Sequence, residues 1–278
     1  MLAPATPAEP VIELTNVTRR FVSPDGKSMT AMKEFNLTVM PGEFVAVVGP
    51  TGCGKSTTLN LVTGLVPPSG GQVSVMGKPV AGIDPSIGFV FQTDALFPWK
   101  SVIDNVVAGP VYRGVKKAKA YEAAHKWLAR VNLSGHENKF PHQLSGGMRK
   151  RVSLAQTFIN EPKILLMDEP FSALDVQTRV LMHDELLKLW GDSGACVIFV
   201  THDLEEAIAL ADKVVVLTSS PATVKSVYTV NIPRPRVASE IRFDPRFLEI
   251  SRVIWDDLRE EVLRGASRDE ARVAELQQ

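Results

Sequence analysis

The segment from residue 49 to residue 57 constrains the fold of this chain more than any other. It follows the pattern glycine, four residues, glycine-lysine-serine, and its residues are Gly49, Pro50, Thr51, Gly52, Cys53, Gly54, Lys55, Ser56 and Thr57. The apolar run 44–48 before it is typical of a buried strand, and residues 58–65 after it favour a helix. A strand, a glycine loop and a helix in this order are the setting in which such a segment binds phosphate.

The residue types of this segment suit a nucleotide and its metal ion. Gly49, Gly52 and Gly54 let backbone N–H groups surround phosphate oxygens without interference from a Cβ atom. The N-terminus of the following helix adds free N–H donors and the positive end of its dipole. Lys55 supplies a mobile charge for the β- and γ-phosphates, and the Ser56 hydroxyl is placed to bind Mg²⁺.

Composition narrows the class of protein. Among 278 residues, 31 are basic and 31 are acidic, so the net charge is zero and a nucleic-acid binder, which is usually basic, is disfavoured. The only cysteines, Cys53 and Cys196, form no zinc pattern and no disulfide framework, which favours a reducing compartment. Residues 1–10 lack the features of a secretory signal and are expected to be disordered, and no apolar run is long enough to cross a membrane.

Polar residues follow three further apolar runs that are predicted to be strands. Gln92 follows 87–91, Asp168 and Glu169 follow 164–167, and His202 follows 196–200. In open α/β sheets ligands bind at the carboxyl ends of the strands. Asp168 is predicted to hold Mg²⁺ through water, Glu169 to polarise the attacking water, and His202 to contact the γ-phosphate. Taken alone, Gln92 is better explained as a polar loop residue. The alternative for Asp168 and Glu169 is a pair of helix-initiating acids, but an Mg²⁺-nucleotide at the phosphate loop favours the functional interpretation.

Ser145, Gly146 and Gly147 form a second candidate anion site. Ser145 is a good N-cap for a helix that continues to residue 158, and the two glycines would allow a ligand to approach closely; a plain helix cap is the alternative. The surrounding region, about 93–160, is predicted to be a helical insertion, with helices over 102–108 and 116–131. Phe21, at the end of a strand predicted over 11–21, could stack on a base or simply pack in the core.

The rest of the chain is predicted to complete an α/β domain and add a tail. Further strands are expected over 32–39, 72–76, 213–217 and 223–230, and helices over 204–211 and from Ser172 to about residue 190. We expect a nucleotide-binding domain over 11–230. The segment 231–278 is expected to hold an extended linker at 233–236 and an amphipathic helix over 245–263, with frayed residues after about 265.

Together these motifs resemble the nucleotide-binding subunit of an ABC transporter over nearly the whole chain. The resemblance departs from the commonest pattern at Met148, where glutamine is usual, and at Phe21, where tyrosine is usual. The family's motifs match Walker A at 49–57, the Q-loop at Gln92, the signature at 144–147, Walker B at 164–168 with the catalytic carboxylate Glu169, the D-loop at 172–175, the switch histidine at His202 and the adenine-stacking aromatic at Phe21.

The resemblance implies a P-loop NTPase fold of the ABC type, with an antiparallel β subdomain and a helical subdomain. It implies ATP hydrolysis with Mg²⁺, in which Ser56, Gln92 and Asp168 surround the metal. Two copies would pair head to tail, each ATP lying between the phosphate loop of one chain and residues 145–147 of the other. Two membrane permease subunits would hold the dimer at the cytoplasmic face of the membrane and would meet a solute-binding protein, and no nucleic acid is expected as a partner.

The residues 94–99, Met148 and the Pro-Arg tail followed by Asp244-Pro245 resemble importers of the nitrate, sulfonate and taurine type. Two other classes compete with this interpretation. A soluble ABC-type ATPase acting on nucleic acid or ribosomes would tend to carry long coiled coils or two cassettes, and a small-molecule kinase would have no use for the 144–147 signature.

Overall fold

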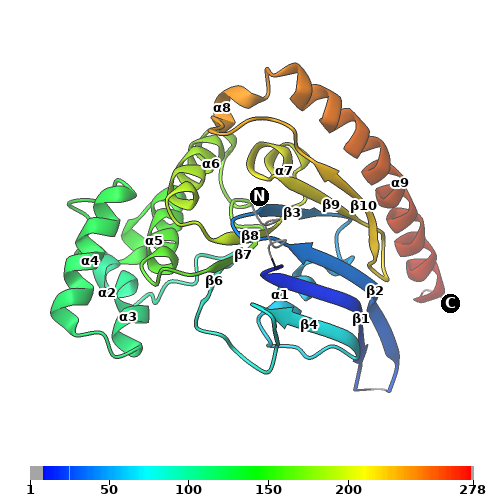
Figure 1. The fold of residues 1–278 in the computed structure, drawn as a ribbon, viewed down its shortest axis with the longest axis horizontal. Coiled ribbons are helices and arrows are strands. Elements are labelled where there is room, and N and C mark those ends of the chain that lie inside the picture. The colour runs from blue at the N-terminus through cyan, green and yellow to red at the C-terminus, as the bar shows by residue number, and fades with distance from the viewer. Residues whose placement is uncertain (1–8, 25, 277–278) are drawn as a thin grey trace, which may run out of the picture.

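Two β-sheets organise the chain, and helices cover the larger one (Figure 1). The computed structural model describes residues 9–24 and 26–276, with side chains up to residue 265. Most of the predicted disordered N-terminus, residues 1–8, therefore lies outside the described residues. None of the helices in the described part is long and apolar enough to cross a membrane.

The larger sheet has six strands in the order β10-β9-β3-β8-β7-β6. Five of them run parallel, and β10 pairs with β9 in the antiparallel sense. The strands are β3 (Phe44–Val48), β6 (Ile87–Val90), β7 (Ile164–Asp168), β8 (Cys196–Val200), β9 (Lys213–Leu217) and β10 (Val224–Thr229). Every residue of β3 and β8 is buried, as expected for parallel strands that are covered on both faces.

The smaller sheet is antiparallel and has the order β2-β1-β4-β5. Its strands are β1 (Ile12–Val22), β2 (Ser28–Val39), β4 (Gly70–Val75) and the two-residue β5 (Lys78–Pro79), which the sequence did not predict. This sheet shares a core with one face of the larger sheet and with α1 (Lys55–Val62), the helix that follows the phosphate loop.

Alternate residues of β3 point into two different cores. Val45 and Val47 face the core shared with α1 and the small sheet, whereas Phe44, Ala46 and Val48 face the core formed with the other helices. This alternation is the two-residue period of a strand. The phosphate loop therefore leaves a strand that is fixed from both sides.

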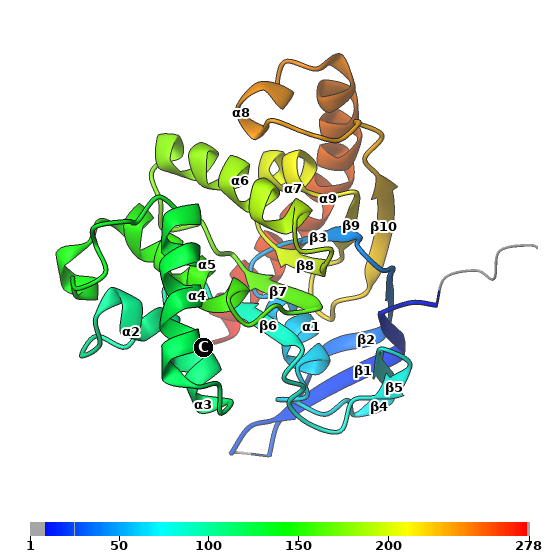
Figure 2. The same ribbon diagram turned by 60° about the vertical axis from the view of Figure 1, so that its left-hand side comes forward.

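The helical insertion contains α2 (Val102–Val106), α3 (Ala108–Tyr112), α4 (Lys117–Arg130) and α5 (Gly146–Phe158), which lie together beside the larger sheet (Figure 2). The single helix predicted over 102–108 is instead two short ones. Pro110 has no N–H group to donate to the carbonyl of Val106, so the helical bonding cannot run on unbroken.

The helix predicted to open at Ser172 begins four residues later. In the structure α6 (Val176–Gly191) is capped by Asp175, whose side chain accepts a hydrogen bond of 2.9 Å from the Thr178 amide. Residues 171–174 form turns and a bend instead. Because a capping carboxylate satisfies the first free N–H groups, the helix starts after Asp175.

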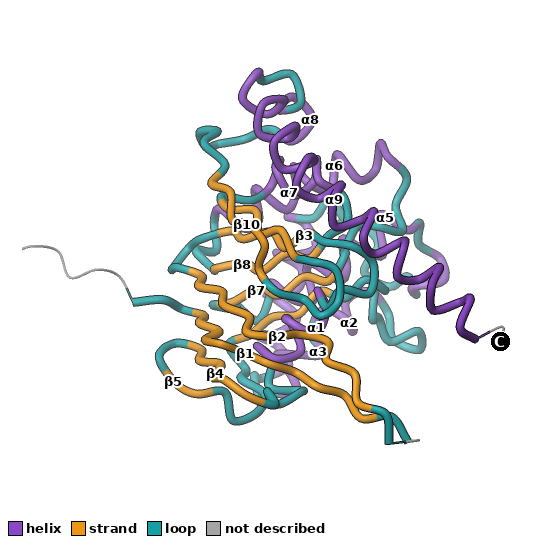
Figure 3. Tube along the Cα trace, turned by 90° about the vertical axis from the view of Figure 1, so that its right-hand side faces the viewer, coloured by secondary structure: helices purple, strands orange, loops and turns teal. Residues whose placement is uncertain are grey.

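The segment predicted to be an extended linker is packed against the domain. Arg236 is 8% exposed and donates to the carbonyls of Ile208, Ala211, Val230 and Ile232. The helix α7 (Leu204–Leu210) lies between β8 and β9 in the chain. After β10 come two more helices. The first, α8 (Ala238–Ile241), was not predicted, and the second, α9 (Pro245–Leu276), extends beyond the predicted end at residue 263. Figure 3 shows the last turns of α9 running away from the strands.

Candidate active site

The parallel register gathers the polar strand ends at one edge of the larger sheet. Val90 pairs with Met167, Asp168 with Val200, and Val47 with Val200. The residues that follow β6, β7, β8 and β3 therefore leave the sheet side by side. This brings together Gln92, Asp168, Glu169, His202 and the phosphate loop, which come from four separate parts of the sequence.

The backbone of the phosphate loop requires glycine where the chain turns into α1. Gly52 and Gly54 have φ angles of 72° and 115°, in the region that side chains rarely adopt. A Cβ atom on Gly54 would also lie 3.2 Å from the carbonyl oxygen of Ala31 on β2. The first amides of α1 have no carbonyl partner within the helix, so their N–H groups are available to bind phosphate oxygens.

Lys55 lies folded over this loop. Its Nζ atom donates to the carbonyl oxygens of Gly49 and Pro50, both at 2.9 Å, and the residue is 6% exposed. Cys53 is also buried, and burial raises the pKa of its thiol, which therefore stays protonated at neutral pH. The loop thus carries a cation but no thiolate that would repel a phosphate.

Two oxygen donors from different elements meet beside the loop. The Ser56 hydroxyl on α1 donates to Oδ1 of Asp168 at 3.0 Å, and burial raises the pKa of the Asp168 carboxyl. In the described part of the chain no three or more His, Cys, Asp and Glu side chains form a metal-binding group. Mg²⁺ commonly takes one or two carboxylates and completes its shell with water and phosphate oxygens, so a hydroxyl and one carboxylate fit this ion.

Glu169 and His202 form a second pair at the same edge. The His202 Nδ1 atom lies 3.0 Å from Oε2 of Glu169, whose side chain is 20% exposed, while that of His202 is 56% exposed. The Glu169 backbone adopts a φ of 42° and its amide donates to the Val200 carbonyl at 2.8 Å. The carboxylate is therefore fixed at the end of β7 but remains accessible to water.

Ser172 connects Gln92 to this pair. The Gln92 Nε2 atom lies 3.4 Å from the Ser172 hydroxyl, which donates to the Glu169 carbonyl at 3.0 Å. The sequence placed Ser172 at the start of a predicted helix and of the D-loop motif, but assigned it no contact at the site. The structure makes it the link between the end of β6 and the end of β7.

The second candidate anion site lies in a different layer of the molecule. Ser145 caps α5 by accepting a hydrogen bond of 3.3 Å from the Met148 amide. The helix α5 packs on β6 and on α2, α3, α4 and α6, with its buried apolar residues in one core, whereas α1 packs on β4, β7 and β8 with its apolar residues in the other core. Among the described residues no hydrogen bond or ion pair joins 145–147 to 49–57.

Phe21 lies on β1, next to the strand β2 that approaches the phosphate loop, and one face of its ring is occupied. It pairs with Met29 in the β1–β2 ladder, two residues from Ala31, whose carbonyl approaches Gly54. The Arg19 guanidinium carbon lies 4.5 Å from the centre of the Phe21 ring. An adenine would therefore have to stack on the opposite face.

Comparison with known proteins agrees with this geometry. A family model described as ABC transporter matches residues 32–172. The chain belongs to the ABC transporter family. It is the ATP-binding subunit, an ATPase whose hydrolysis of ATP serves transport, and the predicted ABC-type α/β fold with an antiparallel sheet is confirmed.

Relatives resemble this ABC ATPase over most of its length. An uncharacterised ABC transporter ATP-binding protein of Methanocaldococcus jannaschii is 42% identical over 254 residues, which are 91% of this chain and 93% of the relative. The taurine import ATP-binding protein TauB of Escherichia coli K12 is 43% identical over 222 residues, 78% of this chain and 87% of TauB.

Solved structures show the same fold. A dimeric post-hydrolysis form of the ATP-binding cassette MJ0796, bound to ADP and phosphate, aligns with a TM-score of 0.70 at 30% identity and covers 80% of this chain and all of that one. CbiO1 of Clostridium perfringens, part of the cbiONQ ABC transporter complex, aligns with a TM-score of 0.72 at 25% identity, covering 88% of this chain and 99% of that one.

Behind His202 lies a buried polar group that the sequence did not reveal. Glu206 on α7 is 5% exposed; its Oε1 lies 2.7 Å from Nε2 of the buried His183, and its Oε2 accepts a hydrogen bond from the Thr201 hydroxyl. Because Thr201 precedes His202, these contacts fix the loop that carries the histidine. A lone glutamate inside a helical pattern gave no signal of this role.

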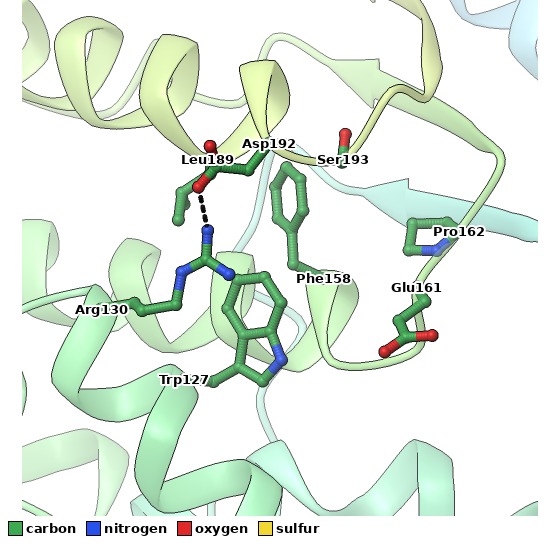
Figure 4. A pocket seen from close by; sticks show the side chains of 8 residues that line it. All are labelled: Trp127, Arg130, Phe158, Glu161, Pro162, Leu189, Asp192 and Ser193. Carbon is green, nitrogen blue, oxygen red and sulfur yellow. Dashed lines mark hydrogen bonds and ion pairs between the residues drawn. The ribbon is translucent and has the colours of Figure 1, made fainter.

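A pocket of about 270 Å³ lies away from the active site, where α4 meets the ends of α5 and α6 (Figure 4). Arg130 covers the Trp127 ring at 4.4 Å and forms an ion pair with Asp192. Phe158, which also lines it, is the last residue of α5, roughly 18 Å along the helix from Gly146 at 1.5 Å per residue. The pocket therefore lies between the helical insertion and α6, and none of its lining residues belongs to the nucleotide site.

Proposed function

We propose that this ABC ATPase energises an importer for a small solute of the nitrate, sulfonate and taurine class. The proposal is supported by the segment 94–99 and by the 43% identity to TauB, which is named for taurine import. The preassembled contacts at the sheet edge carry the ATPase part of the proposal, because they place a metal donor pair and an acid–base pair beside one phosphate loop.

The residues of the site divide the chemistry between them. Lys55 and the amides of residues 49–57 bind the triphosphate, and Lys55 exchanges its two backbone carbonyls for phosphate oxygens. Ser56, Gln92 and Asp168 would hold Mg²⁺, which would neutralise the negative charge that develops on the phosphates. Glu169 orients the attacking water and accepts its proton. His202, paired with that carboxylate in the nucleotide-free chain, turns to the γ-phosphate, and Phe21 stacks on adenine.

We propose further that the site is completed by a second copy of the chain. The phosphate loop contacts the nucleotide on one side, and residues 145–147, at the capped N-terminus of α5, lie in another layer of the same chain. In a head-to-tail pair, Ser145, Gly146 and Gly147 of one chain would cover the γ-phosphate held by the other, because a helix N-terminus favours anions. The MJ0796 cassette is dimeric, which supports this arrangement.

Mixing two inactive variants tests the shared site. Lys55→Ala removes the phosphate contact but keeps the signature, and Ser145→Arg blocks the signature but keeps the loop. In a mixed dimer, one site combines the intact loop of one chain with the intact signature of the other, so turnover is expected to return in the mixture. Ser134→Arg, at an exposed serine of the helical insertion, is the matched control for the arginine. A mixture as inactive as its parts contradicts a shared site.

The surface near the end of β6 supports docking of membrane subunits. A groove of about 230 Å³ lies between the sheet and the helical insertion and is lined in part by Phe91, Asp94, Gly109 and Arg113. Phe91 is 47% exposed at this groove. We propose that two permease subunits insert helices here, which would place the dimer at the cytoplasmic face of the membrane and couple it indirectly to a solute-binding protein.

Uptake measurements test the solute class. A strain lacking this gene is expected to lose energy-dependent uptake of labelled taurine, alkanesulfonate or nitrate, and to regain it with the wild-type gene but not with Glu169→Gln. Unchanged uptake of all three solutes in the deletion strain, with the chain shown to be expressed in its parent, contradicts the proposed class.

A further inference from the structure

A buried lysine joins the signature helix to the segment that carries Gln92. Lys150, in the second turn of α5, is 1% exposed. Its Nζ atom lies 3.1 Å from the Phe91 carbonyl oxygen, 3.3 Å from the Gln92 carbonyl oxygen and 3.3 Å from Oδ1 of Asp94. All three contacts go to one short stretch that is about sixty residues earlier in the chain.

The neighbouring residue strengthens this attachment. Arg149 donates through Nε to Oδ2 of Asp94 at 3.0 Å and through NH1 to the Leu144 carbonyl at 2.8 Å. Both oxygens of Asp94 are therefore held by successive residues of α5. Ala95, which follows, has a φ of 49°, a conformation that a non-glycine residue keeps only when its surroundings hold it.

A lysine at this position requires a reason beyond packing. Burial lowers the pKa of Lys150, and the Asp94 carboxylate opposes that shift. An apolar residue of similar size would fill the same space without the cost of removing an ammonium group from water. What the ammonium provides and an apolar residue cannot is a set of hydrogen bonds to the carbonyl oxygens of two successive residues, Phe91 and Gln92, together with the ion pair to Asp94.

We propose that Lys150 is a positioning residue that fixes the Gln92 side chain relative to Ser145, Gly146 and Gly147. The inference rests on the proposed role of Gln92 at the metal. Gln92 serves the nucleotide bound by its own chain, while the start of α5 covers the nucleotide bound by the partner copy. With Lys150 between them, these two parts of one chain move as a single body.

Hydrogen exchange measures the attachment without depending on activity. Lys150→Met keeps the volume and removes the donors, Lys150→Gln keeps donors without the charge, and Lys126→Met makes the same change at a lysine whose side chain is 72% exposed. In the full-length chain, the peptide covering 91–96 is expected to exchange about tenfold faster in Lys150→Met, less so in Lys150→Gln, and at the wild-type rate in Lys126→Met. Unchanged exchange in Lys150→Met overturns the inference.

Magnesium dependence then separates positioning from general support of the fold. At saturating ATP, Lys150→Met is expected to raise the Mg²⁺ concentration for half-maximal hydrolysis several-fold. It is also expected to lower the melting temperature, because two carbonyl oxygens lose their donor while Asp94 keeps its bond to Arg149. Gln92→Ala is expected to raise the same Mg²⁺ midpoint, and the double variant to show no further shift because both act through one group. A lower melting temperature with an unmoved Mg²⁺ midpoint would mean a structural role and overturn the inference.

The two single variants distinguish failure of this inference from failure of the proposed function. If Gln92→Ala shifts the Mg²⁺ midpoint and Lys150→Met does not, Lys150 does not position Gln92 while the metal role of Gln92 stands. If Gln92→Ala leaves the midpoint unmoved, the proposed metal role of Gln92 is wrong, and the inference for Lys150 falls with it.

Discussion

Replacing Glu169 with glutamine isolates the chemical step from binding. The amide has nearly the shape of the carboxylate, and its oxygen can still accept a hydrogen bond from His202 Nδ1, which lies 3.0 Å from Oε2. The backbone bond from the Glu169 amide to the Val200 carbonyl is untouched. ATP affinity and melting temperature are therefore expected to stay at the wild-type values, while the group that takes the proton from water is lost.

The size of the effect follows from the position of this carboxylate. A positioned general base contributes roughly 10²–10⁴-fold to a rate, which corresponds to about 2.7–5.4 kcal/mol at 1.36 kcal/mol per tenfold. The Glu169 side chain is only 20% exposed and is held at both its backbone and its carboxylate. A preorganised base of this kind belongs in the upper part of the range, so we expect hydrolysis to fall about 10³-fold or more.

Phosphate release from the full-length chain, measured together with ATP binding, decides the outcome. Glu205→Gln is the matched control, because Glu205 is an exposed glutamate on the neighbouring helix α7. It should leave hydrolysis unchanged. A Glu169→Gln chain that hydrolyses ATP within tenfold of wild type refutes the assignment of the base, and one that loses ATP binding refutes the separation of binding from chemistry.

Three further substitutions test packing and charge. A Cβ at Gly147 would lie 2.7 Å from Cγ2 of Thr178, so Gly147→Ala should lower the free energy of unfolding by about 1–3 kcal/mol. Adding Thr178→Ser, which removes that methyl group, should restore stability. If hydrolysis returns as well, Gly147 serves packing and not close approach of ATP. Arg236→Met leaves four backbone carbonyls without their donor and should lower the free energy of unfolding by about 3 kcal/mol in a denaturant titration. The control, Arg242→Met at an exposed arginine, should cause no change. Equal stability of the two variants contradicts a stabilising role for Arg236. Burial raises the pKa of Asp168, so its negative charge costs stability at neutral pH, and this cost disappears as the pH falls through the raised pKa. Asp168→Asn should therefore raise the melting temperature of the nucleotide-free chain at neutral pH, by an amount that shrinks in acid. A variant that melts no higher than wild type contradicts this cost.

The sequence by itself determined the type of fold and indicated which polar residues would meet at the ends of the strands. Continuous apolar runs at 44–48, 164–167 and 196–200 predicted buried parallel strands, because such strands are covered on both faces. Since the carboxyl ends of parallel strands share one edge, residues such as Gln92, Glu169 and His202 could be expected to meet there, and the contacts at this edge show that they do.

Local patterns were less informative where capping or a missing donor decides a boundary. The helix expected from Ser172 begins after Asp175, and the helix expected over 102–108 is divided before Pro110. In both cases one side chain or one absent N–H group outweighs the apolar spacing on which the expectation was based.

Only the tertiary structure identified the residues that act through long-range polar contacts. Nothing in the sequence indicated that Lys150 is buried against the Gln92 segment. Arg236 belongs to a Pro-Arg stretch that was predicted to be a linker, yet it is enclosed by backbone carbonyls. Ser172 and Glu206 likewise have partners on other elements. The spacing of a sequence encodes which face of an element is apolar, whereas the partner of a buried polar group is set by the element that the fold places beside it.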